Sequence, residues 1–177
     1  MRARTPRGKS RQAPPEILGV DHIYLSVADF ERSRAFYDRL MKTLGFKKGT
    51  HAIGGAPHCH YYNRNLQISI RPARAGAAQH DSYSPGLHHL CVRVAGNAAV
   101  DEMARRLRKL GIAVEGPRQW PEYLPDYYAV FFSEPDGIRF EIVNHLKRRK
   151  MVRKLWNELE GFINPVDRLM RKRSKST

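Results

Sequence analysis

One pattern of hydrophobic and polar residues occurs twice in this chain of 177 residues. In each copy an alternating segment, GVDHIYLSV or GLHHLCVRV, precedes an apolar stripe at helical spacing, and a glycine closes the stripe. The interval from His22 to Gly45 is 23 positions, and that from His89 to Gly111 is 22. The repeat predicts one structural unit built twice, each beginning with a strand and a helix.

The segments after the two helices complete the units. Three strand candidates, FKKGTHAI, PHCHYYN and LQISIRPA, follow the first helix, and a short strand near IAVEG follows the second. The last segment, YYAVFFSEPDGIRFEIVN, predicts two strands joined by a tight turn. We expect an α+β fold of two βαβββ units, residues 17–75 and 86–144, whose strands form a curved mixed sheet around a shared cleft.

Each predicted helix has a candidate N-cap. Asp29 and Asn97 stand just before the two apolar stripes, where a side-chain oxygen can accept a hydrogen bond from a free backbone amide.

The basic composition is concentrated outside the duplicated domain. The formal net charge is +15, but residues 1–16 hold five basic and one acidic side chain, and residues 145–177 hold eleven basic and three acidic. The domain at 17–144 therefore carries only +3. A fold that recognises nucleic acid is expected to carry its charge on the body, so such a role is disfavoured for the domain.

The two tails have different patterns. Residues 1–16 contain three prolines and no apolar run, which predicts disorder. Residues 145–177 predict a basic amphipathic helical extension. Its apolar face can dock on the domain or at a dimer contact, and its basic face can bind an anionic membrane surface or a nucleic-acid backbone.

The sequence also indicates a compartment. It contains no secretory signal and no run of about 20 apolar residues that would cross a membrane. Cys59 and Cys91 are the only cysteines and are interpreted as reduced thiols. A cytoplasmic location is expected.

A carboxylate in the middle of the final strand needs a partner. Glu141 is flanked by Phe140 and Ile142, and an unpaired buried charge is costly. Alignment of the two copies places His22 and His89 at the same point of the first strand of each unit. If these strands meet in the cleft, His22, His89 and Glu141 form a divalent metal site of the 2-His-1-carboxylate kind.

A fourth ligand is the less favoured alternative. Ser69 stands where the first unit would carry the duplicate of Glu141, and Gln67 lies one step of the alternation away. Serine is a poor metal ligand and an amide only a moderate one. A one-residue shift in register would also exchange His89 with His88.

Other polar side chains are candidates for the cleft. His60 could act as a general base beside the catalytic Glu141, or it could be a histidine on an exposed edge strand. Arg71 and Arg139 could hold a carboxylate or phosphate, or form ordinary salt bridges. The candidates for substrate contact are Tyr24, Gln67, Ser69, Arg71, Tyr128 and Arg139.

Residues 18–144 resemble the vicinal oxygen chelate superfamily, which includes glyoxalases, bleomycin-resistance proteins, fosfomycin-resistance enzymes and extradiol dioxygenases. The resemblance rests on VDHIYLSVADFERSRAFYDRLMKTLGF, PGLHHLCVRV and YYAVFFSEPDGIRFEIV. It implies that His22, His89 and Glu141 bind one divalent ion, of iron, manganese, zinc, nickel or cobalt. It also implies that two chains can pair as a homodimer.

The resemblance implies a metal-dependent lyase or isomerase that acts on a small oxygen-bearing substrate chelated to the metal. Three departures bear on the activity. Glyoxalase I enzymes carry a glutamate where this chain has Ser69, and extradiol dioxygenases carry a tyrosine where it has Phe131. Bleomycin-resistance proteins bind a cationic drug without a metal and tend to be acidic, whereas this domain is mildly basic and keeps all three ligands. A non-catalytic small-molecule binding or resistance protein of the same fold, or an extradiol-type dioxygenase, is the alternative.

Overall fold

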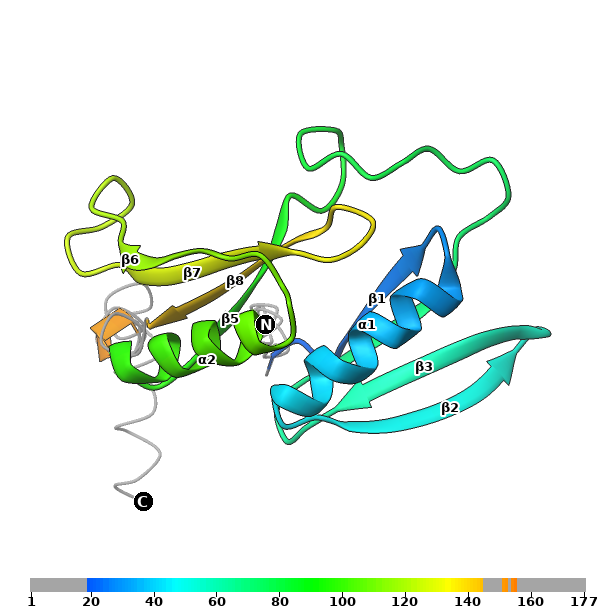
Figure 1. Cartoon of the computed structure of the whole chain (residues 1–177), viewed down its shortest axis with the longest axis horizontal. Coiled ribbons are helices and arrows are strands. Elements are labelled where there is room, and N and C mark those ends of the chain that lie inside the picture. Colours follow the sequence, from blue (N-terminus) through cyan, green and yellow to red (C-terminus); the bar gives the residue numbers. More distant parts are fainter. Residues whose placement is uncertain (1–18, 145–150, 153, 156–177) are drawn as a thin grey trace, which may run out of the picture.

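Two four-stranded sheets, each accompanied by one helix, form the part of the chain that the computed structural model describes, residues 19–144, 151–152 and 154–155 (Figure 1). The first unit runs β1 (His22–Val27), α1 (Phe30–Thr43), β2 (Lys47–Ile53), β3 (Ala56–Tyr62) and β4 (Gln67–Pro72). The second runs β5 (His89–Arg93), α2 (Asn97–Lys109), β6 (Glu115–Gln119), β7 (Tyr128–Ser133) and β8 (Arg139–Asn144).

Both sheets have the same topology. Their strand orders are β1-β4-β3-β2 and β5-β8-β7-β6, with β1 parallel to β4, β5 parallel to β8, and the remaining pairs antiparallel. The predicted α+β fold of two βαβββ units is confirmed. Within the described strands, β1 and β5 each pair on one side only.

Two local predictions need correction. Asp29 caps α1 as predicted and accepts a bond from the Arg32 amide at 3.0 Å. Asn97, however, is the first residue of α2, and the cap is Gly96, whose φ of 92° suits glycine. The short strand expected near IAVEG, residues 112–116, overlaps β6 only at Glu115 and Gly116, because the Ile112 amide bonds back to the Leu107 carbonyl at 3.1 Å and closes the helix.

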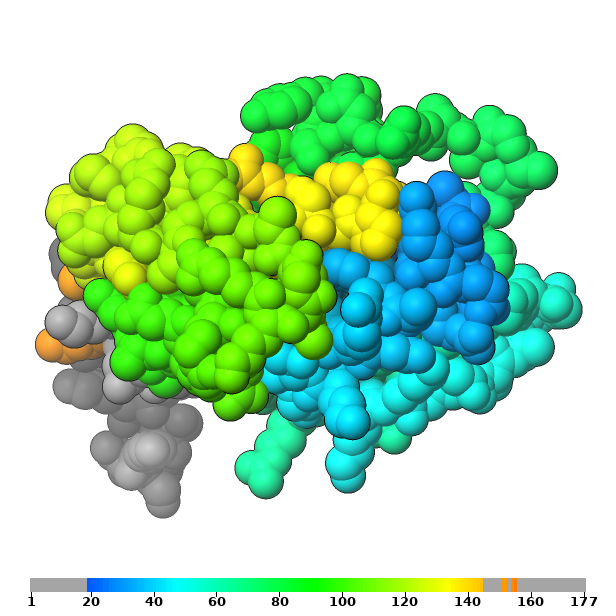
Figure 2. All heavy atoms as spheres, viewed as in Figure 1, coloured from blue at the N-terminus to red at the C-terminus, as the bar shows by residue number. Residues whose placement is uncertain are grey.

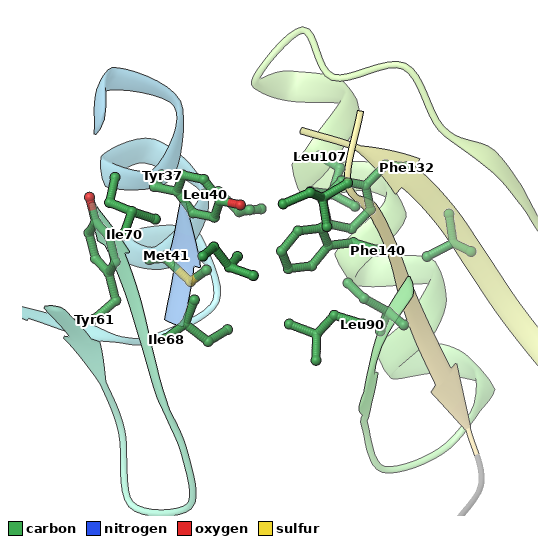
Figure 3. Close-up of a cluster of buried hydrophobic side chains, with 14 of the residues drawn as sticks. Tyr37, Leu40, Met41, Tyr61, Ile68, Ile70, Leu90, Leu107, Phe132 and Phe140 are labelled. Atoms are coloured by element: carbon green, nitrogen blue, oxygen red, sulfur yellow. The ribbon is translucent and has the colours of Figure 1, made fainter. Parts of the chain in front are cut away.

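One hydrophobic core joins the two units. Alternation turns Ile68 and Ile70 of the first sheet and Phe140 of the second toward the helices, and all three belong to one buried cluster. Tyr37 of α1 stacks with Tyr61 at a ring separation of 6.1 Å and meets the ring of Phe140 at 6.2 Å. Figure 3 shows these side chains extending toward one another from the two units. The opposite, polar faces of the sheets therefore turn away from this shared core.

The turn between β7 and β8 fastens the second unit to the start of α1. Asp136 Oδ2 accepts from the Ala28 amide at 2.9 Å and from Ser33 Oγ at 3.4 Å, and Oδ1 pairs with Arg32. Figure 2 shows this turn, in yellow, against the blue start of the first unit. A buried carboxylate with several donors fixes the position of the hairpin relative to α1.

The same turn contains a second buried carboxylate. Glu134 is 4% exposed, and its Oε1 accepts from the amides of Asp136 and Ile138 at 2.9 Å each. Its Oε2 has no hydrogen-bond partner within the described ranges. Burial raises the pKa of Glu134 to about 7.

The predicted tail at 1–16 and most of the extension at 145–177 lie outside the described residues. Met151, Val152 and Leu155, which are described, are exposed. No helix in the described ranges is long and apolar enough to cross a membrane.

Glu134 predicts a pH dependence of folding stability. A glutamate with an ordinary pKa of 4.5 releases its proton in the unfolded chain before the folded protein does. The stability it contributes is therefore complete below about pH 4.5 and is lost as the pH rises through about 7. We expect the wild type to lose about 3 kcal/mol relative to Glu134→Gln between about pH 4 and 8. Urea unfolding at several pH values measures this difference.

Glu122→Gln is the matched control, because Glu122 is exposed on the loop before β7. Its stability should follow the wild type across the same range. A constant difference between wild type and Glu134→Gln would show that this carboxyl titrates normally.

Candidate functional site

The polar face of the second sheet holds the buried carboxylate. Register places Cys91 of β5 and Phe131 of β7 beside Glu141 of β8, on the face opposite α2. Glu141 is 2% exposed. Its Oε2 lies 3.3 Å from Nε2 of His89, and its Oε1 accepts from the hydroxyl of Tyr127. Glu141 thus has an imidazole and a hydroxyl at its oxygens, and the thiol of Cys91 also hydrogen-bonds to it.

An aromatic cluster lies beside this carboxylate. Trp120 and Phe131 are each 4% exposed and meet edge to face at 4.9 Å, with Tyr127 packed against them. The guanidinium of Arg139 lies over Phe131 at 4.4 Å. Burial, together with the neighbouring Glu141, raises the pKa of Tyr127, so its hydroxyl stays a neutral donor. The same causes raise the pKa of the Cys91 thiol to about 12.

The polar face of the first sheet carries histidines and hydroxyls. Register places His22 beside Gln67, Tyr24 beside Ser69, and Ser69 beside His60. Nδ1 of His60 lies 2.9 Å from Oγ of Ser69, which also accepts from the Gln67 amide at 3.0 Å. Burial lowers the pKa of His60, which keeps its imidazole neutral near pH 7.

A single chain does not bring the three predicted metal ligands together. His89 and Glu141 are neighbours, but His22 is exposed on the other sheet, where Nδ1 lies 2.8 Å from Asp21. Among the described residues, no three His, Cys, Asp or Glu side chains are arranged to hold a metal. The physical reason is the shared core, which turns the two polar faces away from each other. Two cavities, of about 820 and 770 Å³, are lined by none of the three.

The other candidates are placed by the alternation of the strands. Tyr24, Gln67, Ser69 and Arg71 lie on the polar face of the first sheet, as predicted. Arg139 lies on that of the second sheet, where it also contacts Glu115 at 3.3 Å.

The prediction that Tyr128 lies in the cleft needs correction. It shares the helix-facing side of β7 with Val130, packs against the core, and donates its hydroxyl to Asp101 of α2 at 2.6 Å. The residue that reaches Glu141 is Tyr127, which was not among the candidates. Strand alternation could have identified Tyr127, because Tyr127, Ala129 and Phe131 alternate onto the same side of the sheet as Glu141.

The comparisons with known proteins agree with this architecture. The family model described as Glyoxalase/Bleomycin resistance protein/Dioxygenase superfamily matches residues 19–142. The uncharacterized protein YqjT of Bacillus subtilis (strain 168) is 30% identical over 125 residues, which cover 69% of this chain and 95% of that protein.

Solved structures share the fold. A glyoxylase/bleomycin resistance protein/dioxygenase domain from Frankia sp. EAN1pec is 25% identical with a TM-score of 0.61, over 73% of this chain and 98% of that one. The fosfomycin resistance protein FosX of Listeria monocytogenes, solved with Mn(II) and sulfate, is 20% identical with a TM-score of 0.54, over 76% and 98% of the two chains.

The bond from Tyr127 to Glu141 predicts a stability effect. Tyr127→Phe removes a donor from a buried carboxylate, so unfolding should become easier by about 1.5–3 kcal/mol. Tyr123→Phe is the control, because Tyr123 is exposed on the same loop and should cost less than about 0.5 kcal/mol. Urea unfolding of both variants measures the difference, and equal stabilities would contradict the described bond.

Proposed function

Because the chain belongs to the Glyoxalase/Bleomycin resistance protein/Dioxygenase superfamily, we propose that it is a metal-dependent enzyme of the lyase or isomerase type. Its substrate would be a small oxygen-bearing molecule, and His22, His89 and Glu141 would hold one divalent ion of iron, manganese, zinc, nickel or cobalt. The observation that carries this proposal is the separation of 3.3 Å between Nε2 of His89 and Oε2 of Glu141 on a polar sheet face.

The residues fit a cation. Glu141 is buried, the hydroxyl of Tyr127 bonds to Oε1, and Oε2 lies 3.3 Å from Nε2 of His89, so a cation bound by both Oε2 and Nε2 would replace that contact. Imidazole and carboxylate groups suit first-row divalent ions. When bound, such an ion acts as a Lewis acid on substrate oxygens that gain negative charge in the reaction. The FosX crystal with Mn(II) supports a metal in this fold.

We infer that the complete site forms between two copies of the chain. The shared core keeps the polar face of the first sheet away from the polar face of the second. In a homodimer, the first sheet of one chain can oppose the second sheet of its partner. His22 of one chain then meets His89 and Glu141 of the partner subunit.

The remaining polar side chains would act on the substrate. The imidazole of His60 is neutral near pH 7, and a general-base role for it would require the tautomer with the proton on Nδ1 and a free lone pair on Nε2. Tyr24, Gln67, Ser69 and Arg71 would contact the substrate from one sheet, and Arg139 from the other. Gln67 is held by Ser69, so a fourth metal ligand from this amide stays the less favoured alternative.

A binding protein without catalysis is the second candidate. It is favoured by the exposure of His22, which the described chain leaves apart from the other two ligands. An extradiol-type dioxygenase is less favoured, because Phe131 has no acid-base group and lies under Arg139.

A cytoplasmic location, and contact of the basic tails with an anionic membrane or nucleic acid, stay predictions. Neither Cys59 nor Cys91 forms a disulfide.

Metal content tests the ligand set. Purified protein loaded with each ion should hold about one metal per chain, and His22→Ala and Glu141→Ala should each lose most of it. Elemental analysis after gel filtration gives the measurement. Ser26→Ala is the control, because Ser26 lies on the same face of β1, two alternation steps from His22. A wild type that stays without metal would leave the binding protein as the better proposal.

Mixing the two inactive variants tests assembly between chains. A heterodimer of His22→Ala and Glu141→Ala contains one intact site and one doubly altered site. After unfolding and refolding together, random pairing should restore about a quarter of the wild-type metal content. A site built within one chain would give no recovery, and that result would contradict the dimeric arrangement.

A further inference from the structure

Three histidines gather on the polar face of the first sheet. His51 of β2 stands opposite His58 of β3 in register, and His60 follows two positions along β3. The rings of His51 and His60 are parallel with centroids 4.1 Å apart, and those of His58 and His60 are 6.1 Å apart. The proposed metal site uses none of these imidazoles as ligands, and the proposed reaction uses only His60.

In two of these histidines, one ring nitrogen is buried without a hydrogen-bond partner among the described residues. His58 is 4% exposed and His60 is 7% exposed. Their Nδ1 atoms lie 2.9 Å from the hydroxyls of Tyr24 and Ser69 respectively. Their Nε2 atoms are buried and have no hydrogen-bond partner in the described part of the chain. A buried polar atom left without a partner is costly, which indicates that a ligand completes the pair.

The neighbouring hydroxyls assign the tautomers. Ser69 Oγ accepts from the Gln67 amide and can therefore donate its own hydrogen to Nδ1 of His60. A Tyr24 hydroxyl that donates to His58 gives the same result there. In each neutral imidazole the proton then sits on Nε2. Both atoms are donors, which suits a negatively charged oxygen, whereas a metal would need their lone pairs.

The charge distribution favours an anion on this sheet. Strands β1 to β4 contain no aspartate or glutamate, whereas the polar face of the second sheet carries Glu141 and Glu115. Arg71 follows Ile70, whose register partner is Cys59, so Arg71 lies beside His58. Burial and the charge of Arg71 lower the pKa of His58, so the arginine supplies the positive charge and the imidazoles supply neutral donors.

We propose that His58, His60 and Arg71 form a binding subsite for the oxyanion group of a small substrate, which is a carboxylate, phosphate or phosphonate. The two Nε2 hydrogens and the guanidinium bind its oxygens. This inference rests on the proposed function, because it places the anionic end of the substrate on the sheet opposite Glu141. His51, exposed on an edge strand and stacked on His60, would have to move aside for the anion to reach that ring.

The test uses the full chain freed of metal by a chelator, with inorganic phosphate and acetate as probes. Imidazole ¹H–¹⁵N spectra report each histidine separately, so binding to the basic tails is distinguished from binding at the subsite. We expect both His58 and His60 to show a protonated Nε2 whose signal shifts along a saturable curve.

Substitutions distinguish the effect of the Nε2 hydrogen-bond donor from the effect of the aromatic ring. His60→Phe keeps an aromatic ring without a donor and should weaken phosphate binding at least about fivefold. His60→Gln returns an amide donor near the Nε2 position and should stay within about threefold of the wild type. His51→Ala should bind as tightly as the wild type or more tightly.

Arg71→Gln and Arg74→Gln form the matched charge pair, because Arg74 is exposed just beyond β4. Only Arg71→Gln should weaken binding, again at least about fivefold. Equal weakening by the two, a deprotonated Nε2 on both histidines, or signals that move only outside the cluster would overturn the subsite.

The outcome is independent of the metal assay. Phosphate binding at the histidines without any metal site would retain the subsite and remove the proposed enzyme. Metal binding with no response at His58 and His60 would retain the proposed enzyme and remove the subsite.

Discussion

The packing of the two units against a common core determines what the rest of the molecule can do. Tyr37 contacts Tyr61 of its own unit and Phe140 of the other, so the helix-facing sides of both sheets are buried together. Hydrophobic burial of this kind is the dominant favourable term in folding. Among the described residues it turns the polar face of each sheet away from the other, and this separates His22 on the first sheet from His89 and Glu141 on the second.

The two polar faces differ in chemical character although the units are duplicates. The second has a buried carboxylate among aromatic rings, with His89 and Tyr127 at its oxygens. The first has imidazoles, hydroxyls and an arginine, and its strands contain no acidic residue. A cleft made from one face of each kind can hold a cation at one side and an anion at the other. Duplication provided the frame, and divergence at positions such as Ser69 and Glu141 provided the asymmetry.

Much of the fold could be predicted from the sequence, because alternation and helical spacing are local signals. They predicted the order of helices and strands along the chain, the cap at Asp29, and the polar side of the strand that carries Glu141. Asn97 and the start of β6 were placed wrongly, since a helix end depends on backbone bonds such as that from Ile112 to Leu107. Tyr128 was chosen over Tyr127 because both stand at the start of a strand, where parity is hardest to assign.

The candidate site was predictable only in part. The duplication matched His22 with His89, and the apolar neighbours of Glu141 indicated that this carboxylate needs a partner, but the predicted site assumed that matching strands meet. Whether they meet within a chain depends on which sides of the sheets are buried together, and that follows from long-range packing between Tyr37 and Phe140. The sequence could not predict the tautomers of His58 and His60 either, because each depends on a hydrogen bond to Tyr24 or Ser69 on another strand.

The unpaired sides of β1 and β5 have a consequence for the behaviour of the protein in solution. Within the described strands, β1 and β5 have a neighbour on one side only, as do β2 and β6 at the opposite edges, so the other side presents backbone donors and acceptors to which a further strand can add. A chain with such edges must limit uncontrolled addition of copies. The net charge of +15 makes copies repel one another at long range, so a charge that lies mostly outside the duplicated domain favours colloidal stability.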